Sequence, residues 1–151
     1  MTSGEVRTRI HEAFAGVTLG NGIGLHEAQT IDDYKDAATR AAERAGDEKE
    51  DWKTIPVSDL NACYSSLSFF DAEGMRFHLP AYLIAALDGE YLQDLSFQLA
   101  FLNDYTIGQF ALLSSEQRAA VRAYLLHIVD DEAFEFSRPQ IVRALDEYWK
   151  A

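Results

Sequence analysis

The chain has 151 residues, of which 48% are apolar and 25% charged, and its 25 acidic and 13 basic side chains give a net charge of -12. These values are typical of a single globular domain and exclude disordered and fibrous classes. Phosphate groups and anionic lipids attract clustered lysine and arginine, which this sequence lacks, so we expect neither a nucleic acid nor a membrane as a partner.

Signals that would direct the chain out of the cytoplasm are not found. Residues 1–16 lack the apolar stretch of a secretory signal. The longest apolar run, residues 79–87, is far shorter than the roughly 20 residues of a transmembrane helix. The single cysteine, Cys63, cannot form an internal disulfide, which favours a reducing compartment. We therefore expect a cytoplasmic protein.

The first third of the chain predicts two helices joined by a glycine-rich connection. Apolar residues at helical spacing predict a helix over residues 5–14. Residues 19–25 contain three glycines, but the lysine and hydroxyl residue that complete a phosphate-binding loop are missing, so we interpret them as a tight connection between helices. Thr30 has the character of a helix start, and an alanine-rich helix is predicted from there to Gly46. Residues 46–53 then form a charged connector.

The middle of the chain predicts a central apolar helix. A serine opens a predicted helix over residues 58–70, and a turn ends it. Pro80 is well placed to open a helix over residues 81–87 that is apolar on every side, and such a helix belongs in the middle of a fold. Residues 92–113 are ambiguous because their apolar residues alternate only in part, which leaves one or two short strands open there.

Two helices near the end of the chain are predicted by capping boxes. Ser114 and Gln117 form one box, which opens a helix that continues to Ile128. Residues 137–140 form the other, with a proline in the first turn. The apolar residues expected on one face of that last helix are Ile141, Val142, Leu145, Tyr148 and Trp149. The sequence thus predicts a mainly α fold, a single compact domain over residues 1–151 with about six helices around a central apolar helix.

No catalytic or metal-binding motif is present. None of the four histidines lies three or four residues from another, the spacing of helical metal ligands, so we interpret them as surface or capping residues. Cys63 falls on the apolar face of its predicted helix and is interpreted as a small buried hydrophobe. No serine occupies a nucleophile elbow. We expect no cofactor and no metal.

One segment carries a candidate binding site formed by Asp71, Glu73, Arg76 and His78. Arg76 is the only lysine or arginine in residues 54–117, and such an isolated arginine is expected to be held by specific acids. In a structural interpretation, Arg76 forms a bidentate pair with Asp71 and Glu73, and His78 caps nearby. In a functional one, Arg76 and His78 face a pocket and bind a carboxylate or phosphate, or act with the two acids as acid and base.

The same segment resembles a known family. Residues 67–83 read LSFFDAEGMRFHLPAYL, which is similar to the hallmark of an uncharacterised family of bacterial proteins. The resemblance extends to residues 19–34, 51–56 and 112–121, and so covers most of the chain. That family is a domain of unknown function without assigned catalytic residues. The resemblance therefore implies a bacterial, cytoplasmic protein and names no activity.

Charge and the candidate segment lead to different functional hypotheses. The net charge favours a non-enzymatic interaction or regulatory domain, immunity-like in character, whose acidic helices engage a basic protein partner. The alternative is a small enzyme or anionic-ligand-binding protein that uses the Asp71–His78 segment. A third possibility, a structural subunit of a larger assembly, predicts a large exposed apolar patch.

Overall fold

Helices alone build the fold, which confirms the expected fold class. The computed structural model describes residues 1–151 and has nine α-helices, three 3-10 helices and no strand. The α-helices are α1 (Ser3–Ala13), α2 (Leu25–Asp32), α3 (Ala37–Gly46), α4 (Val57–Ala62), α5 (Ala72–Leu87), α6 (Leu95–Ala100), α7 (Asp104–Gln109), α8 (Ser115–Ile128) and α9 (Arg138–Glu147). The 3-10 helices are η1 (Trp52–Thr54), η2 (Ser66–Ser68) and η3 (Glu132–Phe134). None of these helices is long and apolar enough to cross a membrane.

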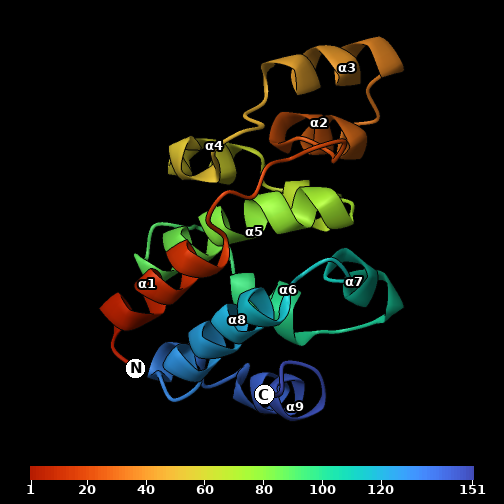
Figure 1. Ribbon diagram of the computed structural model, residues 1–151. Coiled ribbons are helices and arrows are strands. Elements are labelled where there is room, and N and C mark those ends of the chain that lie inside the picture. Colours follow the sequence, from red (N-terminus) through yellow and green to blue (C-terminus); the bar gives the residue numbers. More distant parts are fainter.

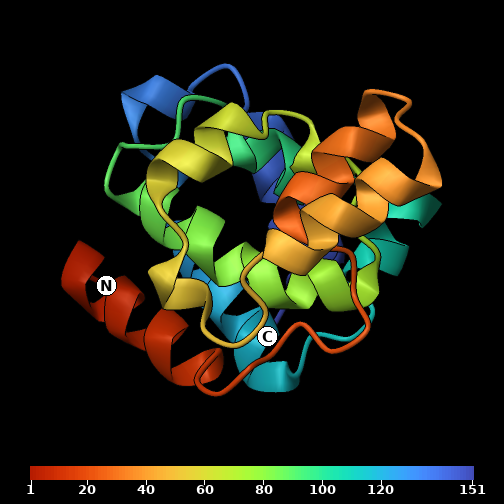
Figure 2. The same cartoon turned by 90° about the horizontal axis from the view of Figure 1, so that it is seen from above.

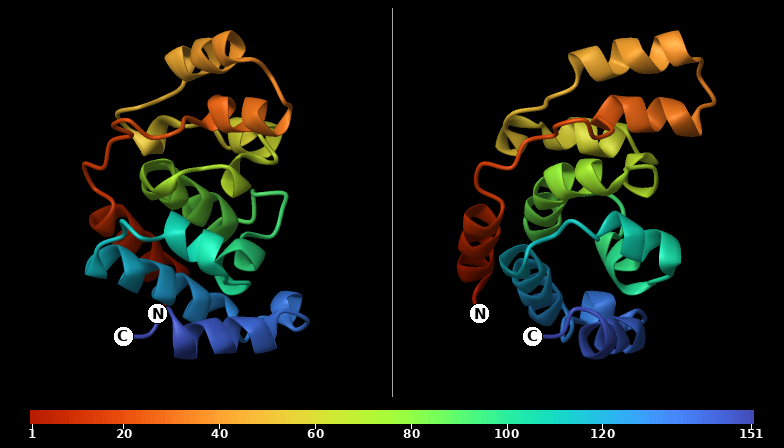
Figure 3. Two further views of the ribbon diagram at one scale, coloured as in Figure 1. Left: turned by 90° about the vertical axis from the view of Figure 1, so that its right-hand side faces the viewer. Right: turned by 45° about the vertical axis from the view of Figure 1, so that its right-hand side comes forward.

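The helices are stacked from α3 at one end of the molecule to α9 at the other, and both chain termini lie near the α9 end (Figure 1; Figure 3). α2 and α3 lie side by side, and in the view from above they stand at the right-hand side of the molecule (Figure 2). One apolar core of 32 buried residues draws on helices from both ends of the chain. α1, although first in sequence, packs against α8 and α5 in this core.

α5 occupies the centre of the stack, as expected of a helix that is apolar on every side. Ten of its 16 residues are buried, and it contacts α1, α4, α6, α7 and α8. The prediction that this helix opens at Pro80 was wrong. Asp71 caps the helix by accepting a hydrogen bond from the backbone amide of Gly74, so the residues taken for a turn are its first turn. Pro80 lies buried inside the helix, where it has no N–H to donate to the carbonyl four residues earlier.

Two of the expected helices are interrupted, which raises the helix count above six. Thr30 does not open a helix but lies within α2, where its hydroxyl donates to the carbonyl of Glu27. Tyr34 adopts a φ of 57 degrees, which ends the helical path, and Asp36 caps a separate helix, α3. The helix expected over residues 58–70 likewise ends at α4, and η2 follows after a break at Cys63. Left-handed or irregular backbone at one residue is sufficient to divide a helix.

Residues 92–113 form α6 and α7 and no strand, which corrects the possibility left open above. Asp94 and Asn103 cap the two helices by accepting backbone amides at their starts. Phe97 and Phe101 account for the partial alternation in the sequence. They are four residues apart on a helical path, so they share one face, and their rings stack with centroids 4.5 Å apart.

The N-terminal and two C-terminal helices confirm the predictions made from caps and spacing. α1 begins two residues before the expected range and ends one residue before its end, and Ser114 and Gln117 form the capping box of α8. α9 begins where predicted, although the side chain of Ser137 makes no capping hydrogen bond. Of the stripe expected on α9, Ile141, Leu145 and Trp149 are buried, whereas Val142 is 43% exposed. The indole of Trp149 donates to the carbonyl of Leu99 at 2.8 Å, which joins the end of the chain to α6.

Candidate functional site

Two of the predicted site residues, Asp71 and Glu73, bind backbone amides of the glycine-rich connection. Asp71 Oδ1 accepts from Ile23 N at 3.0 Å and from Gly74 N at 2.9 Å, and Glu73 Oε2 accepts from Asn21 N at 3.1 Å. A Cβ atom at Gly22 would lie 2.7 Å from the amide nitrogen of Gly74, so only glycine permits this approach. The connection does bind anionic groups, but these are carboxylates of its own chain.

Asp71→Ala is expected to lower the free energy of unfolding by about 2 kcal/mol, because it removes the cap of α5 and a second amide partner at once. Chemical denaturation at neutral pH measures this change. Asp36→Ala is a matched control, since Asp36 also caps a helix through one amide, but that helix, α3, has no buried residue. A loss no larger than that of Asp36→Ala would contradict the double role of Asp71.

Arg76 does not pair with either acid, which corrects the expected bidentate ion pair. It takes part in none of the salt bridges of the structure, and its Nε atom is buried without a hydrogen-bond partner. The physical reason is that Asp71 and Glu73 point toward the glycine-rich connection, where one oxygen of each carboxylate accepts backbone amides.

His78 is fully buried and has one free hydrogen-bonding atom. Its ring stacks on Phe70 with centroids 4.2 Å apart, and its Nδ1 lies 2.7 Å from the carbonyl oxygen of Gly74. A carbonyl only accepts hydrogen bonds, so Nδ1 carries the proton, and in the neutral ring Nε2 is left as an acceptor. Nε2 is buried without a partner. Burial lowers the pKa of His78 to about 4, against a smaller opposing effect of the Gly74 hydrogen bond.

His78 lines a cavity of about 250 Å³ between α2, the α3–α4 connection, α4 and α5. Arg76, Asp71 and Glu73 are not part of its wall. The structure therefore does not bring the four predicted residues together, and His78 alone reaches a cavity. The other polar side chains on the wall include those of His26, Asp47, Glu48 and Asp59.

His26 and Asp47 form a pair that the sequence analysis missed. Asp47 Oδ1 lies 2.7 Å from His26 Nδ1, and the side chain of Asp47 is only 1% exposed. The same carboxylate accepts the backbone amides of His26 and Glu27 at 2.9 and 3.1 Å, and thereby caps α2. Gly24 allows this fit, because a Cβ there would lie 2.3 Å from Asp47 Oδ2. A carboxylate that orients an imidazole through Nδ1 leaves Nε2 available for another group.

The wall of this cavity is rich in hydrogen-bond acceptors and negative charge. Asp47, Glu48 and Asp59 contribute carboxylates, and no lysine or arginine lines the cavity. No set of three or more histidine, cysteine or acidic side chains in the structure is arranged to hold a metal ion. The cavity is therefore suited to a ligand that donates hydrogen bonds and carries positive charge.

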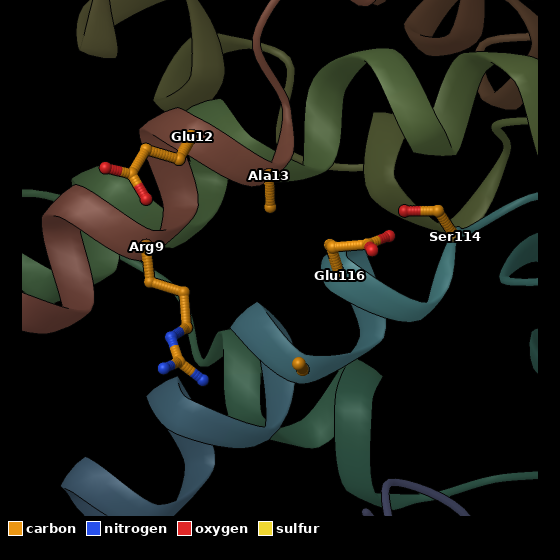
Figure 4. Close-up of a pocket in the computed structure, with 6 residues that line it drawn as sticks. Arg9, Glu12, Ala13, Ser114 and Glu116 are labelled. Carbon is orange, nitrogen blue, oxygen red and sulfur yellow. The ribbon is translucent and has the colours of Figure 1, made fainter.

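A larger hollow of about 430 Å³ lies between α1 and α8. Figure 4 shows Arg9 and Glu12 of α1 on one side of it and Ser114 and Glu116 of α8 on the other. All four of these residues are exposed, and none has a buried polar atom without a partner. This hollow is an open surface groove and lacks the buried, unpaired group that distinguishes the cavity at His78.

An aromatic surface is the other feature that the fold leaves exposed. We define it by Phe97, Phe101, Tyr105 and Ile107 on α6 and α7, which are 58%, 38%, 59% and 39% exposed. The two helices form a small lobe beside α8 (Figure 1) and are tied by a hydrogen bond from Gln98 to Gln109. Phe97 and Phe101 stack on each other within it, and large apolar side chains left exposed in this way are typical of a surface that contacts another molecule.

The fold and these two sites define the chain as an all-helical protein with a small acidic cavity and an exposed aromatic surface. It belongs to a family of unknown function (DUF6714), whose sequence profile matches residues 2–151. This confirms the expected membership of an uncharacterised family. No curated protein and no solved structure shows significant similarity to the chain.

Proposed function

We propose that the chain is a non-enzymatic interaction domain, whose aromatic surface binds a basic, partly apolar segment of a protein partner. The observation that carries this proposal is the stacked pair Phe97 and Phe101, whose rings remain exposed although the core lies next to them. Each exposed aromatic ring keeps apolar surface in contact with water. A partner that covers the ring removes this surface from water, and that burial stabilises the complex.

Charge identifies the kind of partner. Residues 54–117 contain eight acidic residues and a single basic one, Arg76, which lies on α5. Asp94 and Asp104, both exposed, stand at the starts of α6 and α7 next to the aromatic residues. A partner with lysine or arginine beside its apolar side chains complements this surface, and like charges would be repelled. Covering a basic surface of that partner would give the domain a regulatory, immunity-like role.

The alternative of an anionic-ligand-binding protein or small enzyme at Asp71–His78 receives less support. Asp71 and Glu73 each use one carboxylate oxygen to bind backbone amides of the glycine-rich connection, and the cavity next to His78 has no lysine or arginine in its wall. An anion would enter that cavity against the charges of three carboxylates.

We place this function in the bacterial cytoplasm. The cysteine content supports the compartment, since the single Cys63 cannot form an internal disulfide; the thiol is buried, and burial raises its pKa to about 11, which makes it unreactive. The family resemblance of residues 67–83 is the support for a bacterial source.

A displayed library of random peptides, selected on the purified protein, tests the proposal. We expect the enriched peptides to combine lysine or arginine with leucine, isoleucine or aromatic residues. Their affinity should fall at least about tenfold for the Phe97→Ser/Phe101→Ser double variant, because the two rings supply the apolar contact. Higher salt should also weaken binding, because it screens the acidic side chains.

Phe136→Ser is the matched control, since Phe136 is 98% exposed but lies outside α6 and α7. This variant should bind the selected peptides as the wild type does. Enriched peptides without basic residues, or equal binding by the double variant, would overturn the proposal.

A further inference from the structure

We infer that the cavity lined by His26, Asp47 and His78 binds a small molecule through a protonated amino group. This inference does not depend on the aromatic surface, because the cavity is formed by different elements, α2, α4 and α5.

The first argument is the unused acceptor of His78. Its Nδ1 is committed to the Gly74 carbonyl, and its Nε2 is the only buried side-chain polar atom of the cavity wall that lacks a hydrogen-bond partner. A buried acceptor without a partner is unfavourable, and proteins retain one where a bound group satisfies it. A ligand at this atom must donate a hydrogen bond, as an N–H or O–H group does.

Charge selects the amine among such donors. The carboxylate of Asp47 is buried in the wall, where its hydrogen-bond partners are the ring of His26 and two backbone amides. Glu48 and Asp59 add two more carboxylates to the wall. No lysine or arginine of the wall neutralises them. A cationic group is therefore attracted and a carboxylate or phosphate repelled.

Size allows a small molecule, and geometry excludes a metal ion. The volume of about 250 Å³ is several times the roughly 30 Å³ that one water molecule takes up, so the cavity has room for a small organic ligand. A metal ion lacks the three converging ligands that it needs. An ammonium group has three donors, and His78 Nε2, His26 and the carboxylates offer the matching acceptors.

Titration with three small molecules of similar size tests the inference, with ethanolamine as the amine, ethylene glycol as the neutral molecule and glycolate as the anion. The readout is the nitrogen NMR resonance of His78 Nε2 at neutral pH, which responds directly to a hydrogen bond at that atom. We expect ethanolamine to shift this resonance in a saturable manner with a Kd of about 1 to 10 mM, glycolate to cause no shift, and ethylene glycol to bind more weakly than the amine.

Asp59→Asn provides the variant, because Asp59 lies on the wall but makes no hydrogen bond through its side chain that the fold needs. It should weaken ethanolamine binding at least about fivefold. Glu116→Gln is the matched control, since it removes one carboxylate from the groove between α1 and α8, and it should leave the affinity unchanged. No saturable shift with ethanolamine, an equal shift with glycolate, or unchanged affinity in Asp59→Asn would each overturn the inference.

Discussion

Asp47→Ala is expected to lower the free energy of unfolding by about 3 kcal/mol, because it leaves three hydrogen-bond donors near the cavity without their buried carboxylate. Two of these donors are the backbone amides of His26 and Glu27 at the start of α2, and the third is His26 Nδ1. The effect exceeds that of an ordinary helix cap, since Asp47 lies almost wholly inside the protein.

Denaturant titration at neutral pH measures this loss. Glu50→Ala is the control, because Glu50 lies in the same connector, is exposed and makes no side-chain hydrogen bond, so its removal should change stability by less than about 0.5 kcal/mol. Asp47→Asn should fall between the two, since the amide keeps one acceptor oxygen. Equal stabilities of Asp47→Ala and Glu50→Ala would show that Asp47 does not hold α2.

A decrease in pH from about 7 to about 4.5 is expected to cost about 2 kcal/mol of stability through His78 alone. Burial lowers the pKa of His78 to about 4 in the folded protein, whereas an unfolded histidine has a pKa near 6.5. Between these values the unfolded chain binds a proton that the folded chain does not. The stabilisation is therefore complete above about pH 6.5 and is lost as the pH falls toward 4.

Unfolding measured across this pH range tests the expectation. His78→Gln removes the titrating group and keeps an amide donor for the Gly74 carbonyl, so its stability should vary much less with pH. His127→Gln is the control, because His127 is exposed on α8 and its removal should leave the pH dependence of the wild type in place. A steep pH dependence that survives in His78→Gln would contradict the assignment.

The parts of the fold that the sequence predicted correctly are those specified by neighbouring residues. The start of α8 depends on its capping box and that of α9 on a proline in the first turn and on apolar spacing, and both starts were found. The errors arose where one residue's backbone or a distant partner decides the outcome. Tyr34 divides the expected second helix through a positive φ, and Asp71 opens α5 upstream of Pro80 while it also binds residue 23. The positive φ of Tyr34 has no pattern that local propensity can reveal, whereas Asp71 is a residue type favoured at helix starts, and the proline nine residues later was the misleading signal.

In the candidate site, too, the features set by neighbouring residues were predicted and those set by distant partners were not. His78 was identified by its segment, and it does line a cavity. The isolation of Arg76 in the sequence suggested acid partners, but the nearest carboxylates had backbone amides available to them, which composition does not show. The His26–Asp47 pair joins residues 21 positions apart through the packing of α2 against the end of α3, so its proximity could be seen only in three dimensions.

α3 has no buried residue, and Arg44 attaches it to the glycine-rich connection by donating to the carbonyls of Gly20 and Gly22. An element that buries no side chain is expected to open locally at a lower free energy than the core helices. Residues 46–48, where α3 ends, form part of the cavity wall. One side of the cavity is therefore formed by an element that the apolar core does not hold in place.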